Sequence, residues 1–353
     1  MRVFTILAFL ATLIVGAFGT SAATTPLVFF RETGMYFINS DSTGLKLLDG
    51  DGAPAALWIS QTEVVYRKQL NLWKINIKTG LAEQLTTEGL IKNPKAWRDE
   101  DEFGGYIDVD CPVINKSRNE LYYRVIDLDT FEVQWKVMNL KTRQIADFPE
   151  KWGSITDAVG DKIYGDFGSM PSRLVVWDLK TGEAKPLTEA RGIWGDCQAR
   201  ISPDGTLLAF SRNMQIWLYD LTKNTTRFLY QKAQKPDWSP DGNQLLCQNH
   251  MQTKVREYQY DQIIVVNLDG TAKILVQGKD YQDGAQFLHP AGWTKDGNIV
   301  WSQMYSGMTS GGYWHRSDIK LVDPRTGAKS LIVKNGDNNQ SGQKSQNRKN
   351  AHC

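Results

Sequence analysis

Residues 201–224 read ISPDGTLLAFSRNMQIWLYDLTKN. Two turn signals enclose the apolar runs of this stretch, Ser-Pro-Asp-Gly at residues 202–205 and Asp-Leu-Thr-Lys-Asn at residues 220–224. Proline presets the backbone for a turn, glycine accepts a left-handed φ, and an Asp or Asn side chain caps the turn backbone. The stretch therefore predicts short antiparallel strands that are joined by hairpin turns.

The second turn signal recurs along the whole chain. Its seven copies begin at Asn39, Asn76, Asn139, Asp178, Asp220, Asn267 and Asp323. The first signal recurs at residues 239–242 and, in a looser form, at residues 294–297. Two hairpin turns and four strands per unit are the composition of a propeller blade. We therefore expect an all-β fold, a β-propeller of four-stranded antiparallel blades, with seven blades, or six if the first unit at residues 27–52 lacks an innermost strand.

Three segments carry a family resemblance, namely ISPDGTLLAFSR, PDWSPDGNQLLCQN and GWTKDGNIVWSQ. They resemble the WD40-like (PD40-type) propeller repeat of TolB-type periplasmic proteins, most specifically over residues 193–333 and more weakly over residues 53–192. This resemblance implies a propeller that acts as a binding or interaction module. The seven-bladed oligogalacturonate lyases are similar, being propellers of related repeats with a histidine-rich metal site at one mouth. That likeness implies a second class of function, a lyase.

The two ends of the chain differ in composition from the repeats. After Met1 and Arg2, residues 3–18 are mostly apolar and residues 19–23 are small, which is typical of a signal peptide cleaved near Ala23, with an uncleaved anchor as the alternative. No second apolar run is long enough to cross a bilayer, so we expect a secreted or periplasmic protein without an integral membrane segment. Residues 24–334 form the predicted propeller domain, and residues 335–353 form a polar tail that we expect to be disordered.

Charge balance and motifs argue against several classes of function. Lys and Arg number 41 and Asp and Glu number 39, so the net charge of +2 argues against a nucleic-acid partner. The sequence has no GxSxG, GxGxxG or GxxxxGKS/T motif, which are the signatures of serine hydrolases, dinucleotide-binding proteins and P-loop enzymes. Its four cysteines show no CxxC spacing, so we expect thiols, with a Cys197–Cys247 disulfide as the alternative. We expect the chain to be a monomer.

The predicted strand order gives the ring two different faces. In a four-stranded meander, the turns between the first and second strands and between the third and fourth strands share one face, which we call the scaffold face. The linkers between blades and the loops between the second and third strands share the other, the linker face. Long inserts at residues 126–132, 248–260 and 302–318 are expected on the linker face. Long loops on a rigid ring commonly build binding sites.

Polar and aromatic side chains of the two late inserts and of the linker before the last blade form the candidate site. If the protein is an enzyme, its catalytic residues are expected to be His250, His289, Tyr305, His315 and Arg316. The expected ligand-binding residues are Asn249, Arg256, Tyr258, Tyr260, Gln303, Tyr313 and Trp314. Imidazoles from neighbouring blades suit a divalent transition metal or a base for β-elimination from a uronic acid. No HxxxH spacing supports a metal site, so solvated loop histidines are the alternative.

An acidic stretch provides a second candidate metal site. Asp99, Asp101, Asp108 and Asp110 flank a pair of glycines on the linker side of the third unit. Carboxylate oxygens are the ligands that Ca²⁺ prefers, although the spacing is not that of an EF-hand, and a solvated acidic loop is the alternative. Overall the sequence favours an exported binding module for a protein or a polysaccharide. The alternatives are a uronate polysaccharide lyase, or a sensor or structural part of a larger assembly.

Overall fold

The computed structural model describes residues 13–15, 24–31, 34–92, 105–149, 153–167, 172–189, 196–252, 259–278, 284–309 and 312–334. These ranges form 29 strands and no helix. A helix that is long and apolar enough to span a membrane is likewise not found among them. The all-β prediction is confirmed.

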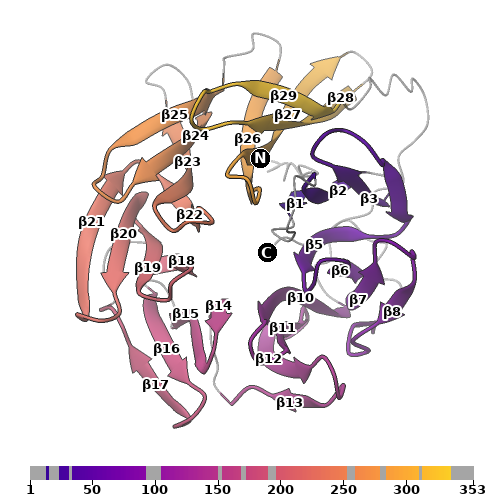
Figure 1. Cartoon of the computed structure of the whole chain (residues 1–353). Coiled ribbons are helices and arrows are strands. Elements are labelled where there is room, and N and C mark those ends of the chain that lie inside the picture. The colour runs from indigo at the N-terminus through magenta and orange to yellow at the C-terminus, as the bar shows by residue number, and fades with distance from the viewer. Residues whose placement is uncertain are drawn as a thin grey trace, which may run out of the picture.

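Seven antiparallel sheets follow one another around a ring in chain order (Figure 1). Blade 1 holds β1 (Leu13–Val15), β2 (Pro26–Arg31), β3 (Gly34–Asn39) and β4 (Lys46–Asp49); blade 2 holds β5 (Ala53–Trp58), β6 (Glu63–Lys68), β7 (Asn71–Asn76) and β8 (Ala82–Gln84). Blade 3 holds β9 (Leu90–Ile91), β10 (Tyr106–Asn115), β11 (Glu120–Asp127), β12 (Glu132–Asn139) and β13 (Ile145–Asp147); blade 4 holds β14 (Ser154–Val159), β15 (Lys162–Phe167), β16 (Arg173–Asp178) and β17 (Glu183–Pro186). Blade 5 holds β18 (Asp196–Ile201), β19 (Leu207–Arg212), β20 (Gln215–Asp220) and β21 (Thr225–Gln231); blade 6 holds β22 (Gln234–Trp238), β23 (Gln244–Gln252), β24 (Gln259–Asn267) and β25 (Ala272–Gln277). Blade 7 holds β26 (Gly284–Trp293), β27 (Ile299–Thr309), β28 (Gly312–Val322) and β29 (Lys329–Val333).

The recurring Asx turns join the third and fourth main strands of every blade, as the sequence predicts. In blade 5 the Asp220 carboxylate accepts hydrogen bonds from the backbone N–H groups of Thr222 and Lys223, both at 3.0 Å. Asn224 closes that turn with a left-handed φ of 54°. The side chain therefore replaces the backbone partners that the turn lacks, which explains why the signal repeats so regularly.

Tryptophans of the innermost strands of blades 6 and 7 fasten each of these two blades to the one before it. The indole N–H of Trp238 on β22 donates to the Arg200 carbonyl of β18 at 2.9 Å. That of Trp293 on β26 donates to the Asp237 carbonyl of β22 at 3.2 Å. Their rings are buried in the apolar clusters between blades, so these tryptophans serve packing.

The ring closes by packing between the first and last blades, each of which is built from one continuous segment. Leu27 and Phe29 of blade 1 lie in one apolar cluster with Val300 and Ile319 of blade 7. The first blade also has an innermost strand, which residues 27–52 do not supply. This strand is β1, which lies within the apolar run predicted to be a signal peptide. The count of seven blades is confirmed.

Candidate functional site

Blades 6 and 7 are built from longer strands than blade 5. In blade 5, β19 and β20 have six residues each, whereas β23 and β24 of blade 6 have nine. In blade 7, β26 has ten residues, and β27 and β28 have 11 each. The prediction of long loops at residues 248–260 and 302–318 is therefore largely wrong, because most of these inserts extend the hairpins. Pairing across the hairpin satisfies backbone groups that a loop would leave to water.

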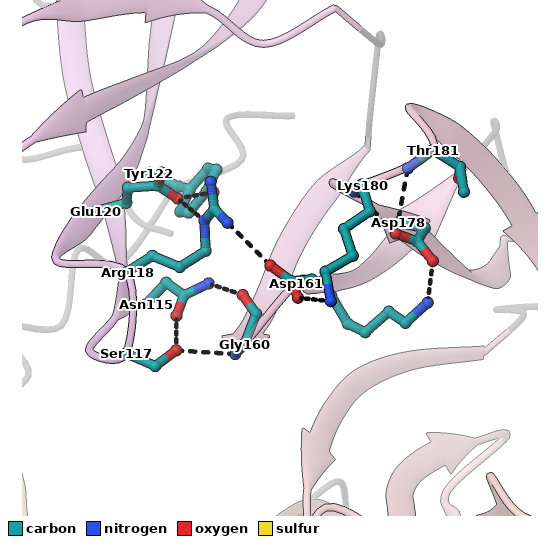
Figure 2. Close-up of polar contacts among 11 residues, drawn as sticks. Asn115, Ser117, Arg118, Glu120, Tyr122, Gly160, Asp161, Asp178, Lys180 and Thr181 are labelled. Atoms are coloured by element: carbon teal, nitrogen blue, oxygen red, sulfur yellow. Dashed lines mark hydrogen bonds and ion pairs between the residues drawn. The ribbon is translucent and has the colours of Figure 1, made fainter.

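Contacts between turns of neighbouring blades bear out the grouping on the scaffold face (Figure 2). The Asn115 side-chain amide at the end of β10 donates to the Gly160 carbonyl in the first turn of blade 4 at 2.8 Å. Asp161 in that turn receives Arg118 of blade 3 at 2.9 Å and Lys180, in the last turn of its own blade, at 2.7 Å. Lys180 and Arg118 lower the pKa of Asp161 by hydrogen bonding and by their charges. The turns of this face therefore support one another, while the extended hairpins project from the other.

A buried polar layer lies at the base of the extended hairpins, and we call it the polar seam. It consists of the buried residues Gln248, Asn249, Gln262, Gln303 and Asp318 and of half-buried Lys320. The Gln248 amide of blade 6 donates to the Leu288 carbonyl of blade 7 at 2.8 Å, and so joins the two blades. Lys320 donates to Gln303 and lies 3.7 Å from the Asp318 carboxylate. The amine also lies 5.3 Å from the centre of the Trp301 ring, which is a cation–π contact.

Among the described residues, the side-chain oxygens of Gln248 and Asn249 in the polar seam have no hydrogen-bond donor. Asn249 donates to Gln262 at 2.7 Å, but its own Oδ1 is unpartnered although the residue is 5% exposed. The Oε1 atom of Gln248 also lacks a donor among the described residues, and Gln248 is 1% exposed. A buried carbonyl oxygen without a donor costs about 1–3 kcal/mol. A hydrogen-bond donor at the base of the hairpins, such as a water molecule or a hydroxyl group, would therefore form a favourable hydrogen bond with one of these oxygens.

The predicted site residues fall into three groups. Asn249 and Gln303 belong to the polar seam, and half-buried His289 lies opposite Ser302 in the ladder of blade 7. His250, Tyr260, Tyr305, Tyr313, Trp314, His315 and Arg316 lie on the extended hairpins, where the structure describes the backbone only. Arg256 and Tyr258 lie outside the described residues. The structure thus brings the described members of this set to two neighbouring blades, and how their side chains meet stays a prediction.

Four members of the polar seam were missed by the sequence reasoning, namely Gln248, Gln262, Asp318 and Lys320. Each lies within or directly beside an apolar run of a central strand, and this position was the available signal. Its meaning depends on pairing between strands that are distant in sequence, because Gln303 lies opposite Asp318 and Asn249 lies opposite Gln262.

Two of the four aspartates in the predicted calcium site form bidentate ion pairs with arginines. Arg67 of β6 donates from Nε and Nη2 to the two oxygens of Asp108, at 3.0 and 2.5 Å. Arg124 grips Asp110 in the same way, at 2.8 and 2.7 Å. Asp99 and Asp101 lie outside the described residues. Within the described part of the chain, no group of three or more His, Cys, Asp or Glu residues has a geometry that suits a metal ion, so calcium stays a prediction.

The described cysteines include both thiols and a disulfide-bonded residue. Cys197 and Cys247 are thiols, so the Cys197–Cys247 disulfide is wrong. Cys247 is buried in the cluster between blades 5 and 6, and burial raises its thiol pKa. Cys111, on the innermost main strand of blade 3, is disulfide-bonded.

Comparisons with known proteins place the fold. No protein-family model and no curated protein matches the sequence. The oligogalacturonate lyase of Vibrio parahaemolyticus is 12% identical with a TM-score of 0.59, over 86% of this chain and 90% of that one. An oligogalacturonate lyase in complex with manganese is 12% identical with a TM-score of 0.58, over 86% and 87%.

Two further structures extend the comparison. TolB of Acinetobacter baumannii is 12% identical with a TM-score of 0.47, over 91% of this chain and 79% of that one. The tricorn protease is a larger protein, of which the chain spans 34%, at 12% identity and a TM-score of 0.46 over 92% of this chain. At such identities a likeness shows the fold alone. The chain is a seven-bladed β-propeller, consistent with the TolB-like repeat that its sequence resembles.

Proposed function

We propose that the chain is an exported binding module that takes up a polysaccharide or a protein on its linker face, at the extended hairpins of blades 6 and 7. The observation that carries this proposal is the lengthening of five strands on two neighbouring blades. Blade 3 also has long strands, since β10 has ten residues and β11 and β12 have eight each, but blades 6 and 7 are the two long-stranded blades that are neighbours. A rigid ring that presents elongated hairpins on one side suits recognition of an extended ligand.

The composition of the hairpins favours a polysaccharide over a protein. The hairpin β27–β28 carries Tyr305, Tyr313, Trp314 and Arg316 within a short span. Aromatic rings stack on the apolar faces of sugar rings, and a guanidinium group pairs with the carboxylate of an acidic sugar. The ladder sets Tyr305 directly opposite Arg316, which joins both kinds of contact at one level of the hairpin.

A glycan array followed by calorimetry tests the proposal, using the chain from Thr24 onward. We expect binding to acidic polysaccharides, and a loss of roughly tenfold or more in affinity for Tyr305→Ala and for Arg316→Ala, as for anchor residues of other sites. Lys180→Ala on the scaffold face is the matched control and is expected to bind normally. If no glycan and no protein binds, or if the hairpin variants bind as well as the control, the proposal is wrong.

A lyase is the second candidate function. Two oligogalacturonate lyases share the fold, one of them in complex with manganese, and His250, His289 and His315 lie on strands of blades 6 and 7. Of these three imidazoles, only that of His289 belongs to a side chain that the structure describes, so no metal geometry follows. Absorbance of unsaturated products from oligogalacturonate, with added Mn²⁺, measures this activity. Activity that survives triple alanine replacement of the histidines excludes their role.

A further inference from the structure

The innermost strand of blade 1 is supplied by the N-terminal apolar run. Leu13, Ile14 and Val15 of β1 pair with Phe29, Val28 and Leu27 of β2 in antiparallel register. This short strand also contacts β5 of blade 2 and both β26 and β27 of blade 7. It therefore fills the point at which the ring closes.

The same residues belong to the segment that is expected to be cleaved near Ala23. Removal of that segment takes away the neighbour of β2 on its inner edge, where Leu27, Val28 and Phe29 are at most 1% exposed in the complete ring. Backbone groups and apolar side chains at this edge would then be left without cover. We propose that, in the chain that starts at Thr24, the inner edge of β2 is an acceptor site for an extended apolar strand of a partner protein. In the complete chain, β1 occupies this site.

The walls of the site define the chemistry of the strand that fits. Val28 of β2 packs into the cluster with Trp58 and Tyr66 of blade 2. Leu27 and Phe29 pack on the opposite side, into the cluster with blade 7. A strand beside β2 is therefore covered on both faces and must be apolar at successive positions, because buried strands lack the alternation of half-exposed ones. The sequence Leu-Ile-Val of β1 meets this requirement.

The C-terminal tail of the chain has the wrong composition to fill the site. Between Val333 and Ala351 the sequence contains no aliphatic or aromatic side chain. Polar side chains on a strand that is buried on both faces would lose their hydration without gaining partners. This tail therefore does not fit the site, and we assign the occupant to another polypeptide, which adds a strand by main-chain pairing as in other cases of β-augmentation.

Peptide binding to the chain from Thr24 onward tests the proposal. The probe is a fluorescent peptide of residues 10–18, LATLIVGAF, with added lysines for solubility, and anisotropy reports its binding. We expect saturable binding and a rise in Tm of the chain. The same peptide with Ile14→Pro is expected to bind at least about tenfold more weakly, because proline removes a ladder hydrogen bond. The chain that retains residues 1–23 is expected to bind neither peptide, since β1 occupies the site.

Three results would overturn the proposal. The first is the absence of binding by the chain from Thr24, and the second is equal binding of the two peptides. The third is N-terminal sequencing of the exported protein that begins before residue 13, because β1 is then a permanent strand of the ring. Glycan binding at the extended hairpins is measured separately, so failure of one proposal does not imply failure of the other. A Phe29→Ala variant removes an aromatic ring from the apolar wall of the site and leaves the backbone of β2 unchanged. It is expected to weaken peptide binding without preventing folding.

Discussion

Removal of the guanidinium group from the Arg67–Asp108 pair is expected to destabilise the ring strongly. The pair joins β6 of blade 2 to β10 of blade 3, with side chains that are 8% and 2% exposed. In an Arg67→Met variant the methylene stem is kept, but the two hydrogen bonds to Asp108 are lost. Breaking a buried ion pair on one side typically costs about 3–5 kcal/mol, because the remaining charge has no compensation. We expect a loss of this size at neutral pH.

The loss should depend on pH in a defined direction. Burial raises the pKa of Asp108 above its usual value, even though Arg67 and its hydrogen bonds act to lower it. Without Arg67 that pKa rises further, so the folded variant binds a proton that the unfolded chain releases. Stability is then retained below the unfolded pKa and falls as pH rises toward the folded pKa, by up to about 1.4 kcal/mol per pH unit. The free energy of unfolding of the variant should therefore be closest to that of the wild type near about pH 4, where free carboxylates titrate. It should be furthest from it near about pH 7, where a buried carboxylate with a raised pKa loses its proton.

Urea unfolding of both proteins, followed by tryptophan fluorescence between about pH 4 and pH 8, measures this difference. The control is the double variant Arg67→Met with Asp108→Leu, in which no charge is left buried. It is expected to recover most of the lost stability and to show no extra pH dependence, because well-packed apolar pairs often replace buried ion pairs at little cost. A single variant that loses less than about 1 kcal/mol at neutral pH, or loses the same amount at every pH, would refute the reasoning.

Three further predictions concern the scaffold and the cysteines. Asn115→Ala should lower the free energy of unfolding by about 1–3 kcal/mol, measured by urea unfolding, because it removes the 2.8 Å bond that ties blade 3 to the Gly160 carbonyl. Gly89→Ala should reduce the yield of folded protein, because a Cβ atom would lie 2.0 Å from the Leu70 carbonyl oxygen. Gly182→Ala is the control, because its Cβ atom would meet no atom within 4 Å, and its φ of 71° should lower the free energy of unfolding by only about 1 kcal/mol. A thiol reagent added to the unfolded but unreduced protein should modify Cys197 and Cys247 and leave Cys111 unmodified, because Cys111 is disulfide-bonded and the other two are thiols; labelling of Cys111 before reduction would contradict this expectation.

The fold could be predicted because its decisive signals are local. Each Asx turn is encoded within five residues, as at Asp220, where the side chain caps backbone groups two and three positions ahead. Seven such turns fix the number and direction of the strands without any knowledge of distant contacts. The first blade was the exception, since its innermost strand comes from a segment whose composition also suits export.

The site was only partly predictable because it depends on register between distant strands. Strand alternation placed the inserts of blades 6 and 7 on one face, but it could not show that they continue as strands. The side-chain amide of Gln248 joins blade 6 to blade 7 only because it donates to the Leu288 carbonyl, which lies 40 positions further along the chain. A polar residue in an apolar strand therefore marks a place where two blades must be paired before its role is defined. The linker face could be chosen from the sequence, whereas the polar seam beneath it follows only once Gln303 is set opposite Asp318.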